Sequence, residues 1–301
     1  MSLEPGYKRH NPKGTKGIIL AGGVGTRLYP LTSLYSKQLV AVYDKPMVYY
    51  PLSILILAGI REILIISDEK TLPSYKKLFG DGSQYGLDIE YALQDKPRGI
   101  AEAMIIGEGF SGEKDTVLIL GDNIFYGTLS FLRNAVAENK GATVFGYYVN
   151  DPKSYGVVEF DKEGKAISLE EKPSKPKSNY AIPGLYVYDN TAAERAKNLK
   201  PSPRGELEIT DLNKAYMSEG KLRVEMMNRG IAWLDSGTPD SLLDSSNFIA
   251  SVEKRQGLKI GCIEEVALRM GMIDKEGFNR LIQNLPNCYY REYLERISQD
   301  F

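Results

Sequence analysis

The sequence predicts an α/β fold built on a mostly parallel central sheet that is flanked by helices. Short apolar runs of strand length recur along the first half of the chain, at 17–21, 62–67, 88–93, 116–120 and 142–149. Segments with helical spacing of apolar residues lie between them, at 47–58, 101–110 and 129–138. Strands that alternate with helices are typical of parallel sheets. Ligands of such sheets bind beyond the carboxyl ends of the strands, so we expect functional side chains after Ala21, Ser67 and Leu120.

The pattern changes near residue 150. Three strand-like segments follow with few helices between them, at 155–161, 166–170 and 180–188. They indicate a β-rich sector that lies over the main sheet and supplies the second half of a binding site. We therefore expect a core over residues 16–240 that divides into 16–150 and 151–240.

Both ends of the chain differ from this core. Residues 1–15 mix proline, glycine and basic side chains without a hydrophobic run, and we expect a flexible tail there. Near the other end, Thr238 is placed as a helix N-cap, Pro239 at the first helical position and Gly257 just past the helix end. Further helical spacing follows at 264–270 and 276–285. We therefore expect a C-terminal helical region over 241–301.

Composition narrows the classes of function. The chain has 301 residues, 43% hydrophobic and 26% charged, which is the balance of an ordinary globular protein. Its formal net charge of -1 does not favour the binding of a polyanion, so we expect no nucleic acid partner. Its apolar stretches fall short of the roughly 20 residues of a membrane span, and we expect no membrane. Cys262 and Cys288 lack the spacing of a metal site, and a chain of this length does not need a disulfide to fold. We therefore expect the protein in the reducing cytoplasm.

A glycine-rich turn, Gly22-Gly23-Val24-Gly25-Thr26-Arg27, directly follows the first predicted strand. Glycines permit positive φ angles and let phosphate oxygens approach the backbone amides, so the turn suits a triphosphate. A P-loop is excluded because no Lys-Ser or Lys-Thr follows, and a dinucleotide fingerprint is excluded because Leu28 replaces its third glycine. Asp44 has the spacing of a ribose-binding acid, but the turn-like segment 43–46 leads us to discount it. An ordinary tight turn without a ligand fits the glycines equally well.

Two cations follow this turn, Arg27 and Lys37. A phosphorus centre under attack gathers negative charge, so fixed cations near it stabilise phosphoryl or nucleotidyl transfer. Taken singly, each is more often a solvated surface charge. The one histidine, His10, lies in the tail, so we expect neither a histidine general base nor a histidine metal cluster.

Two aspartates are candidate magnesium ligands. Asp122 ends the apolar run 117–121, and Asp235 ends the run 232–234 in a distant segment. Magnesium typically takes one or two carboxylates and completes its coordination with water and substrate phosphate, so this pair suffices. The alternative is that both are turn residues that bond to their own backbone.

These residues belong to a longer series of motifs. The motifs are LAGGVGTRL (20–28), SKQL (36–39), YDKPM (43–47), GDN (121–123), YGVVEF (155–160), EEKP (170–173), PRGELEITD (203–211) and WLD (233–235). With them, the sequence closely resembles the sugar nucleotidyltransferase family, in particular its glucose-1-phosphate thymidylyltransferases. The resemblance runs from about residue 16 to the C-terminal helices.

The resemblance implies a Rossmann-like nucleotide-binding core over 16–150 and a sugar-phosphate sector over 151–240. It places the glycine turn and Arg27 on the triphosphate and Lys37 beside the reacting phosphates, with Mg2+ on the two aspartates. It also implies that Gln94 and Gly99 meet the thymine edge. The residues implied to line the sugar-phosphate site are Asn123, Tyr155, Gly156, Glu171, Lys172 and Arg204. Three positions, Arg98, Ile100 and Glu102, depart from the commonest family pattern.

The implied reaction is in-line attack by glucose 1-phosphate on the α-phosphorus of dTTP, which gives dTDP-glucose and pyrophosphate for dTDP-L-rhamnose or related deoxysugar synthesis. A phosphomonoester has a second pKa of about 6, so the nucleophile is already ionised and needs no general base. The alternatives are the same chemistry with UTP or CTP, or a non-catalytic nucleotide-sugar sensor. Family members that carry such C-terminal helices are generally homotetramers. The resemblance therefore implies a homotetramer with a feedback site for dTDP-rhamnose around 257–262.

Overall fold

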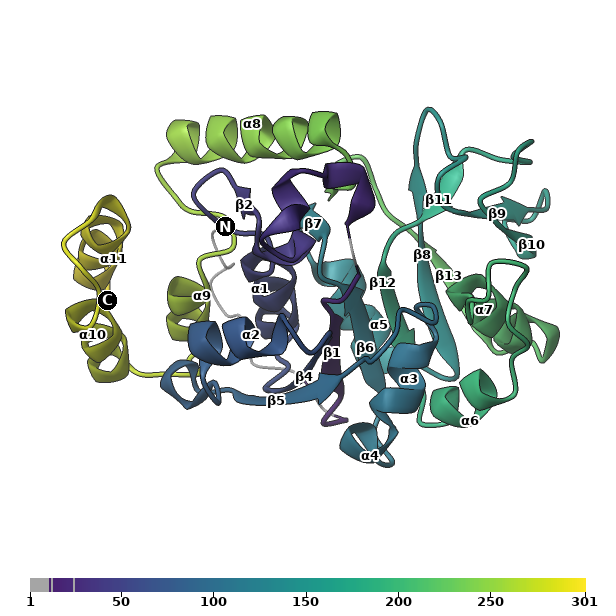
Figure 1. Ribbon diagram of the computed structural model, residues 1–301, viewed down its shortest axis with the longest axis horizontal. Coiled ribbons are helices and arrows are strands. Elements are labelled where there is room, and N and C mark those ends of the chain that lie inside the picture. Colours follow the sequence, from purple (N-terminus) through teal and green to yellow (C-terminus); the bar gives the residue numbers. More distant parts are fainter. Residues whose placement is uncertain (1–10, 12, 24) are drawn as a thin grey trace.

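A ten-stranded sheet runs through the centre of the protein, with helices on both faces (Figure 1). The computed structural model describes residues 11, 13–23 and 25–301; most of the expected tail, His10 included, and Val24 of the glycine turn lie outside them. The strand order is β10-β9-β11-β8-β12-β6-β1-β4-β5, and β13 pairs with β8. The strands are β1 (Lys16–Leu20), β4 (Glu62–Ser67), β5 (Asp88–Leu93), β6 (Thr116–Leu120), β8 (Ala142–Tyr148), β9 (Gly156–Phe160), β10 (Ala166–Glu171), β11 (Tyr180–Ile182), β12 (Leu185–Tyr188) and β13 (Leu222–Met226).

The sheet has a parallel half and a mostly antiparallel half. Strands β6, β1, β4 and β5 are parallel, and their register places Ile18 of β1 between Leu64 of β4 and Leu118 of β6. Strand β12 then runs antiparallel between β6 and β8, and β11, β9 and β10 continue the antiparallel half. The α/β fold with a mostly parallel core and a β-rich sector is therefore confirmed. The expectation that this sector lies over the main sheet is wrong, because β11 pairs with β8, and β9 and β10 follow it in the same sheet.

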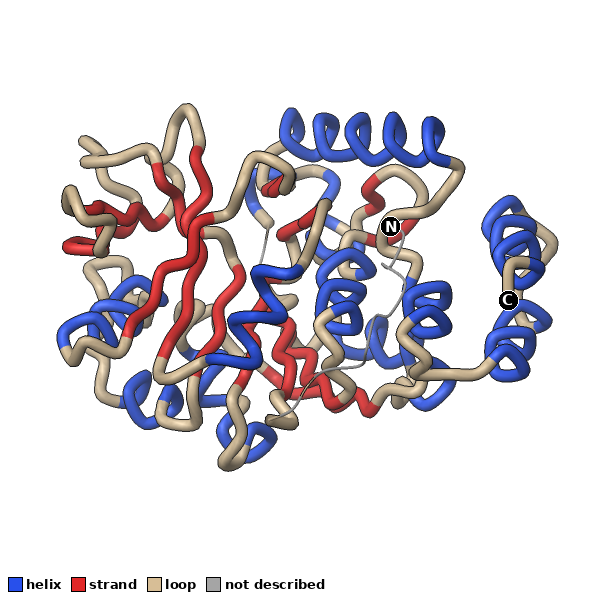
Figure 2. The backbone as a smooth tube through the Cα atoms, turned by 180° about the vertical axis from the view of Figure 1, so that it is seen from behind, coloured by secondary structure: helices blue, strands red, loops and turns tan. Residues whose placement is uncertain are grey.

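The strands of the parallel half are apolar on both faces because helices cover both. Ile19 of β1 packs into one core, and its neighbours Ile18 and Leu20 pack into the other, as the two-residue period of a strand requires. One face is covered by α1 (Tyr49–Leu57), α2 (Leu72–Phe79), α5 (Ser130–Glu138) and α9 (Ile263–Arg269). The other is covered by α3 (Glu102–Ile106), α4 (Glu108–Ser111), α6 (Ala192–Lys197) and α7 (Ile209–Ser218). Figure 2 shows the helices and strands from behind.

Two predicted segments are interrupted at glycines. The helix predicted over 101–110 breaks at Gly107, where an added Cβ would lie 2.5 Å from Ile18 Cδ1. The strand predicted over 180–188 is also wrong as one element, because it divides into β11 and β12 at Pro183 and Gly184. Proline supplies no N–H to a ladder, and a Cβ on Gly184 would lie 2.6 Å from Leu120, so the chain changes partners there.

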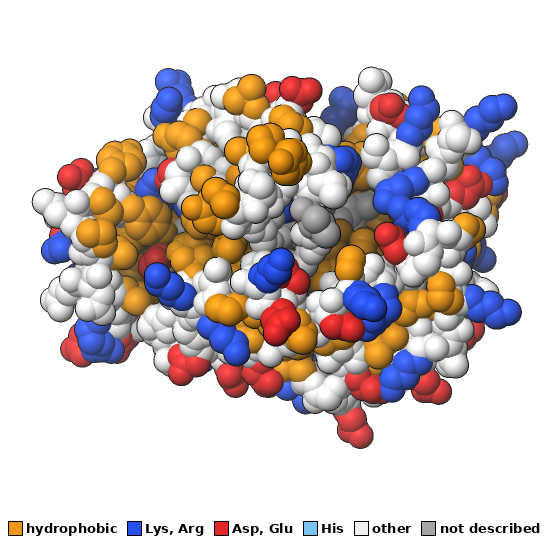
Figure 3. Space-filling view, viewed as in Figure 1, with side chains coloured by type: hydrophobic (Ala, Val, Ile, Leu, Met, Phe, Trp, Pro, Cys, Tyr) orange, Lys and Arg blue, Asp and Glu red, His pale blue; other side chains and the backbone are white. Residues whose placement is uncertain are grey.

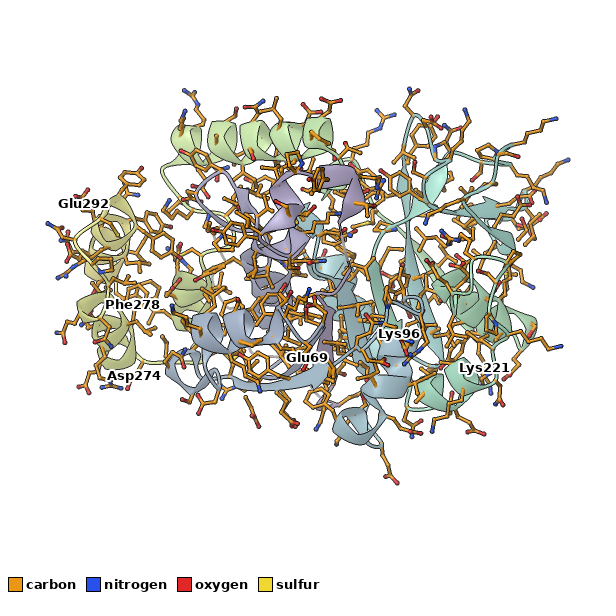
Figure 4. The ribbon with its side chains drawn as sticks, in the orientation of Figure 1. Glu69, Lys96, Lys221, Asp274, Phe278 and Glu292 are labelled. Atoms are coloured by element: carbon orange, nitrogen blue, oxygen red, sulfur yellow. The ribbon has the colours of Figure 1, made fainter. Side chains whose placement is uncertain are left out.

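The C-terminal region begins with α8 (Pro239–Gln256). Thr238 Oγ1 accepts the Ser241 amide at 3.2 Å, and Gly257 ends the helix with a φ of 70°, so the predicted cap and stop are confirmed. Helix α9 packs on α1, whereas α10 (Lys275–Gln283) and α11 (Tyr289–Gln299) pack on each other at one end of the molecule. Figure 4 labels Asp274 and Phe278 at α10 and Glu292 on α11. None of the helices in the described ranges combines the length and apolar character needed to cross a bilayer.

Short elements outside the central sheet complete the described chain. They are β2 (Ala41–Val42), β3 (Lys45–Pro46), β7 (Asn123–Tyr126), β14 (Ala232–Asp235) and the 3-10 helices η1 (Thr26–Leu28), η2 (Leu31–Ser33), η3 (Lys37–Leu39) and η4 (Ser83–Tyr85). Strands β2 and β3 form a hairpin whose turn holds Asp44. The Asp44 carboxylate pairs with Lys45 and Lys259, which explains its presence in this turn without a ribose.

Candidate active site

The glycine turn lies at the carboxyl end of β1 and leads into η1. Gly25 has a φ of 60°, and an added Cβ would meet the Thr32 side chain at 2.8 Å. Thr32 Oγ1 donates to the Gly25 carbonyl at 2.9 Å, and Gln38 Nε2 donates to the Gly22 carbonyl at 3.1 Å. Glycine is therefore required at position 25 by backbone conformation and by close packing, and the turn is held from two sides.

A cleft of about 320 Å³ opens beside this turn, and we call it the glycine-turn cleft. It is lined by the turn, by the segment that follows it and by the ends of β4 and β5, at Gly22, Gly23, Thr32, Ser33, Leu34, Tyr35, Ser36, Asp68, Lys70, Thr71, Gln94, Asp95 and Pro97. Figure 4 labels Glu69 and Lys96, which follow β4 and β5 at this edge of the sheet. The cleft therefore lies at the carboxyl edge of the parallel strands, as expected.

Gln94 is the buried amide of this cleft. Its Nε2 donates to Glu102 Oε2 at 2.8 Å, and Glu102 Oε1 accepts Arg98 Nε at 2.6 Å. A carboxylate only accepts hydrogen bonds, so the Gln94 amide nitrogen has to face it. The Gln94 oxygen consequently faces Gly22, where an added Cβ would lie 3.0 Å from it. Glu102 was singled out from the sequence only as a departure from the family pattern, and its contact with Gln94 was missed.

Gly99 is near this cleft without being among its lining residues. Its φ is 106°, and an added Cβ would lie 2.3 Å from the Leu207 carbonyl oxygen. Leu207 is held there by its amide, which donates to the Arg98 carbonyl at 2.7 Å. Close packing and backbone conformation are therefore sufficient reasons for glycine here, and contact with a base stays a prediction.

Asp122 and Asp235 are brought together by the two-stranded ribbon of β7 and β14. Asp122 precedes β7, and the register pairs Asn123 at the start of β7 with Asp235 at the end of β14. Burial raises the pKa of the Asp235 carboxyl, and the nearby negative charge of Asp122 raises it further. Two carboxylates from segments more than 100 residues apart thus share one partly buried site.

This pair fits a magnesium ion. Carboxylate oxygens are hard ligands, and a divalent cation between them would offset the repulsion that raises the pKa of Asp235. Within the described residues, no group of three or more His, Cys, Asp or Glu side chains forms a metal site, so water and substrate phosphates would complete the coordination.

Both predicted cations lie beside the aspartates. Lys37 is 7% exposed, and its Nζ pairs with Asp122 Oδ2. An added Cβ on Gly237 would lie 3.0 Å from Arg27 Nη2 and 3.3 Å from each Asp235 carboxylate oxygen, so Gly237 leaves room for that guanidinium. The structure thus joins Arg27 and Lys37 to the predicted metal site.

A second cleft, of about 660 Å³, contains the aspartates, and we call it the carboxylate cleft. Its lining includes ten of the predicted site residues: Thr26, Arg27, Asp122, Asn123, Tyr155, Gly156, Glu171, Lys172, Arg204 and Asp235. Gly22 and Gly23 line the first cleft, whereas Thr26 and Arg27 line the second. The two clefts therefore adjoin at the glycine turn.

The charged sugar-phosphate candidates, Glu171, Lys172 and Arg204, form a cluster in the carboxylate cleft. Glu171 Oε2 accepts a hydrogen bond from Thr210 Oγ1, and Glu171 Oε1 lies 3.6 Å from Lys172 Nζ. Lys172 has a φ of 42°, a left-handed conformation that costs free energy for a lysine and often marks a functional site. Figure 3 shows Lys and Arg side chains gathered over the neighbouring sector of β9 and β10. Lys172 is thus available for a phosphate beside a carboxylate that can accept hydrogen bonds from sugar hydroxyl groups. Arg204 donates Nε and Nη2 to the Glu208 carboxylate in this structure.

Sequence reasoning missed several residues that line the carboxylate cleft. Thr210 is 1% exposed and orients Glu171, and Asn213 is completely buried on the same helix, α7. Trp233 donates Nε1 to Asn123 Oδ1 at 2.6 Å. The sequence signal was present for Trp233, the single tryptophan, because it stands two residues before Asp235.

Fold and site together define a nucleotidyltransferase. A profile of the family described as Nucleotidyl transferase matches residues 16–252. A glucose-1-phosphate thymidylyltransferase of Xanthomonas campestris pv. campestris (strain B100) is 55% identical over 286 residues, which cover 94% of this chain and 97% of that protein. One of Mycobacterium tuberculosis (strain ATCC 25618 / H37Rv) is 52% identical over 280 residues, with 93% and 97% covered. The chain therefore belongs to the nucleotidyl transferase family, among the glucose-1-phosphate thymidylyltransferases.

Solved structures agree with this assignment. A crystal structure described as a glucose-1-phosphate thymidylyltransferase of Bacillus anthracis, in complex with a sucrose, has a TM-score of 0.73 and 40% sequence identity. It covers 78% of this chain and 94% of its own. A UDP-glucose pyrophosphorylase complexed with UDP-glucose has a TM-score of 0.70 at 22% identity, covering 80% and 99%, and shows the fold alone.

Proposed function

We propose that this enzyme transfers the thymidylyl group of dTTP to glucose 1-phosphate and releases pyrophosphate. The observation that carries the proposal is the junction of the two clefts at Gly22, Gly23, Thr26 and Arg27. In this proposal, a triphosphate held along this turn presents its α-phosphorus to the carboxylate cleft, where Lys172 and Arg204 would hold the sugar phosphate.

In the proposed step, a phosphate oxygen of glucose 1-phosphate attacks the α-phosphorus of dTTP. The new P–O bond forms as the bond from the α-phosphorus to the α,β-bridging oxygen breaks, and pyrophosphate leaves with that electron pair. The nucleophile is ionised at neutral pH, so no side chain has to accept a proton. Arg27 and Lys37 stabilise the negative charge that gathers at the reacting phosphates.

Asp122 and Asp235 are the residues that would hold Mg2+. When bound, this ion supplies charge stabilisation and a fixed orientation to the substrate phosphates. Lys37, already paired with Asp122, places a second positive charge at the same point. Asn123, Tyr155 and Gly156 line the same cleft and complete our proposed sugar-phosphate site.

The proposed base contact is made by Gln94. Its oxygen faces the glycine-turn cleft because its nitrogen is committed to Glu102. An acceptor at this point suits the N3–H of thymine or uracil and opposes the unprotonated N3 of cytosine. UTP therefore remains a closer competitor of dTTP than CTP does.

A label-transfer experiment tests this proposal. The enzyme is incubated with Mg2+, glucose 1-phosphate and dTTP radiolabelled at the α-phosphate or, in a parallel sample, at the γ-phosphate. The proposal predicts label in the nucleotide sugar from the first sample and in pyrophosphate from the second. Binding of both substrates without any label transfer would instead support a nucleotide-sugar sensor.

We further propose a cytoplasmic homotetramer whose product enters dTDP-L-rhamnose or related deoxysugar synthesis, with feedback binding of dTDP-rhamnose around 257–262. The location rests on the family resemblance, because the cavity lined in part by Lys259, Ile260 and Gly261 has a volume of about 30 Å³, which is too small for a nucleotide sugar without rearrangement. Sedimentation equilibrium tests the tetramer, and initial rates at increasing dTDP-rhamnose test the feedback. A monomer, or rates that dTDP-rhamnose leaves unchanged, would contradict the respective part.

A further inference from the structure

The Asn123 side-chain amide has one chemically permitted orientation. Asn123 is 4% exposed, and its Oδ1 accepts Trp233 Nε1 at 2.6 Å and the Gly184 backbone amide at 3.0 Å. An indole N–H and a backbone N–H can only donate, so the amide oxygen has to face both of them. The amide nitrogen consequently points the other way, toward Asp122.

Asp122 is held at both of its carboxylate oxygens. Oδ1 accepts Asn123 Nδ2 at 2.8 Å, and Oδ2 pairs with Lys37 Nζ. Each carboxylate oxygen has two lone pairs, so both oxygens keep an acceptor position for another ligand. The two contacts therefore fix the plane of the carboxylate without occupying it completely.

The ribbon explains why Trp233 reaches Asn123. Trp233 and Asp235 are two residues apart on β14, so their side chains leave the same face of the strand. Asn123 is the register partner of Asp235, which makes Trp233 its diagonal neighbour on that face. The indole ring is held by edge contacts with Tyr147 and Tyr155, at centroid distances of 5.6 Å and 4.9 Å.

We propose that Trp233 and Asn123 are positioning residues that aim the Asp122 carboxylate at the metal shared with Asp235. The inference rests on the proposed metal site, and it assigns Trp233 a role through Asn123 rather than through the substrate. Neighbours of metal ligands act in this way when they fix the direction of a ligand's lone pairs. Asn123 Nδ2 keeps a second hydrogen, so positioning is compatible with its proposed contact with the sugar phosphate.

Contact with the sugar phosphate is the competing explanation for both residues, because both line the carboxylate cleft. Metal binding measured without sugar phosphate separates the two explanations. The probe is Mn2+ alone, followed by the loss of its free-ion electron paramagnetic resonance signal. The wild type is compared with the variants Trp233→Phe, Asn123→Ala and Asp235→Asn. Thermal unfolding shows whether each variant is folded.

Tyr147→Phe is the matched control. Tyr147 packs on the same indole ring and donates its hydroxyl to the Ile231 carbonyl at 3.2 Å, so the change disturbs this neighbourhood but leaves the Trp233 hydrogen bond in place. We expect its dissociation constant for Mn2+ to equal that of the wild type.

We expect Trp233→Phe to raise the dissociation constant for Mn2+ about 10-fold and Asn123→Ala roughly 10- to 100-fold. Should one variant not fold, the other decides the question. Wild-type affinity in the folded variants, with Asp235→Asn weakened, would overturn the positioning role and leave the metal site intact. Absence of Mn2+ binding in the wild type, or normal binding by Asp235→Asn, would overturn the metal site and this inference together.

Discussion

Asp235 lies directly opposite Asn123 in the antiparallel ribbon of β7 and β14, and this register sets Asp235 beside Asp122. The site therefore depends on a pairing between two short strands that are far apart in the sequence. The ribbon is separate from the central sheet, and both aspartates line the carboxylate cleft.

Asp122→Asn is expected to lower turnover by about 100- to 1,000-fold, because it weakens charge stabilisation at the reacting phosphates. Initial rates of pyrophosphate release measure this change, and Asp244→Asn on the exposed side of α8 is the matched control. Near-normal turnover of Asp122→Asn would remove Asp122 from the metal site.

Lys37→Met should lower turnover by about 100-fold or more, because it removes the charge while it keeps an unbranched side chain of similar size. Lys37 is buried against Asp122, so a lost charge cannot be replaced by another mobile lysine. The rate is measured at saturating dTTP and glucose 1-phosphate, with Lys140→Met at an exposed position as control. Equal rates for the two variants would show that Lys37 only balances the charge of Asp122.

Asp235→Asn is predicted to stabilise the metal-free protein at neutral pH. The pKa of Asp235 is raised in the folded state, so its ionisation opposes folding increasingly as pH rises from the ordinary carboxyl range through the raised value. Below the ordinary range both states bind the proton, and this contribution disappears. Thermal unfolding in chelator at acid and neutral pH measures it. A variant that is less stable than the wild type at neutral pH would contradict the assignment.

Gln94→Leu should lower kcat/KM for dTTP about 10-fold, because it removes one hydrogen bond to the base. It should also reduce the preference for dTTP over dCTP, since the base then meets no fixed acceptor. Competition between the two nucleotides in one reaction measures the preference, and Gln84→Leu at an exposed position is the control. An unchanged preference would place the base elsewhere.

Much of the parallel half could be predicted from the sequence because its signals are local. Strands such as β1 and β4 are continuous apolar runs, and the ends of α8 are marked by Thr238 and Gly257. The division between β11 and β12 could not be predicted, because it depends on which neighbours each half of the segment pairs with.

Candidate residues could be predicted individually, whereas their contacts could not. Asp122, Asp235 and Arg27 stand out by residue type and by their places after apolar runs or glycines. The contact of Trp233 with Asn123 depends on a strand register between distant segments, and that of Glu102 with Gln94 on how α3 packs beside β5. Such contacts follow from tertiary packing, which residue spacing does not specify.

The central claim is tested most directly by pyrophosphate release from the purified enzyme with Mg2+ and glucose 1-phosphate, comparing dTTP, UTP, CTP, ATP and GTP in parallel. We predict release that requires both substrates and is fastest with dTTP. Faster release with another triphosphate would contradict the proposed base contact, and no release with any of them would contradict nucleotidyl transfer itself.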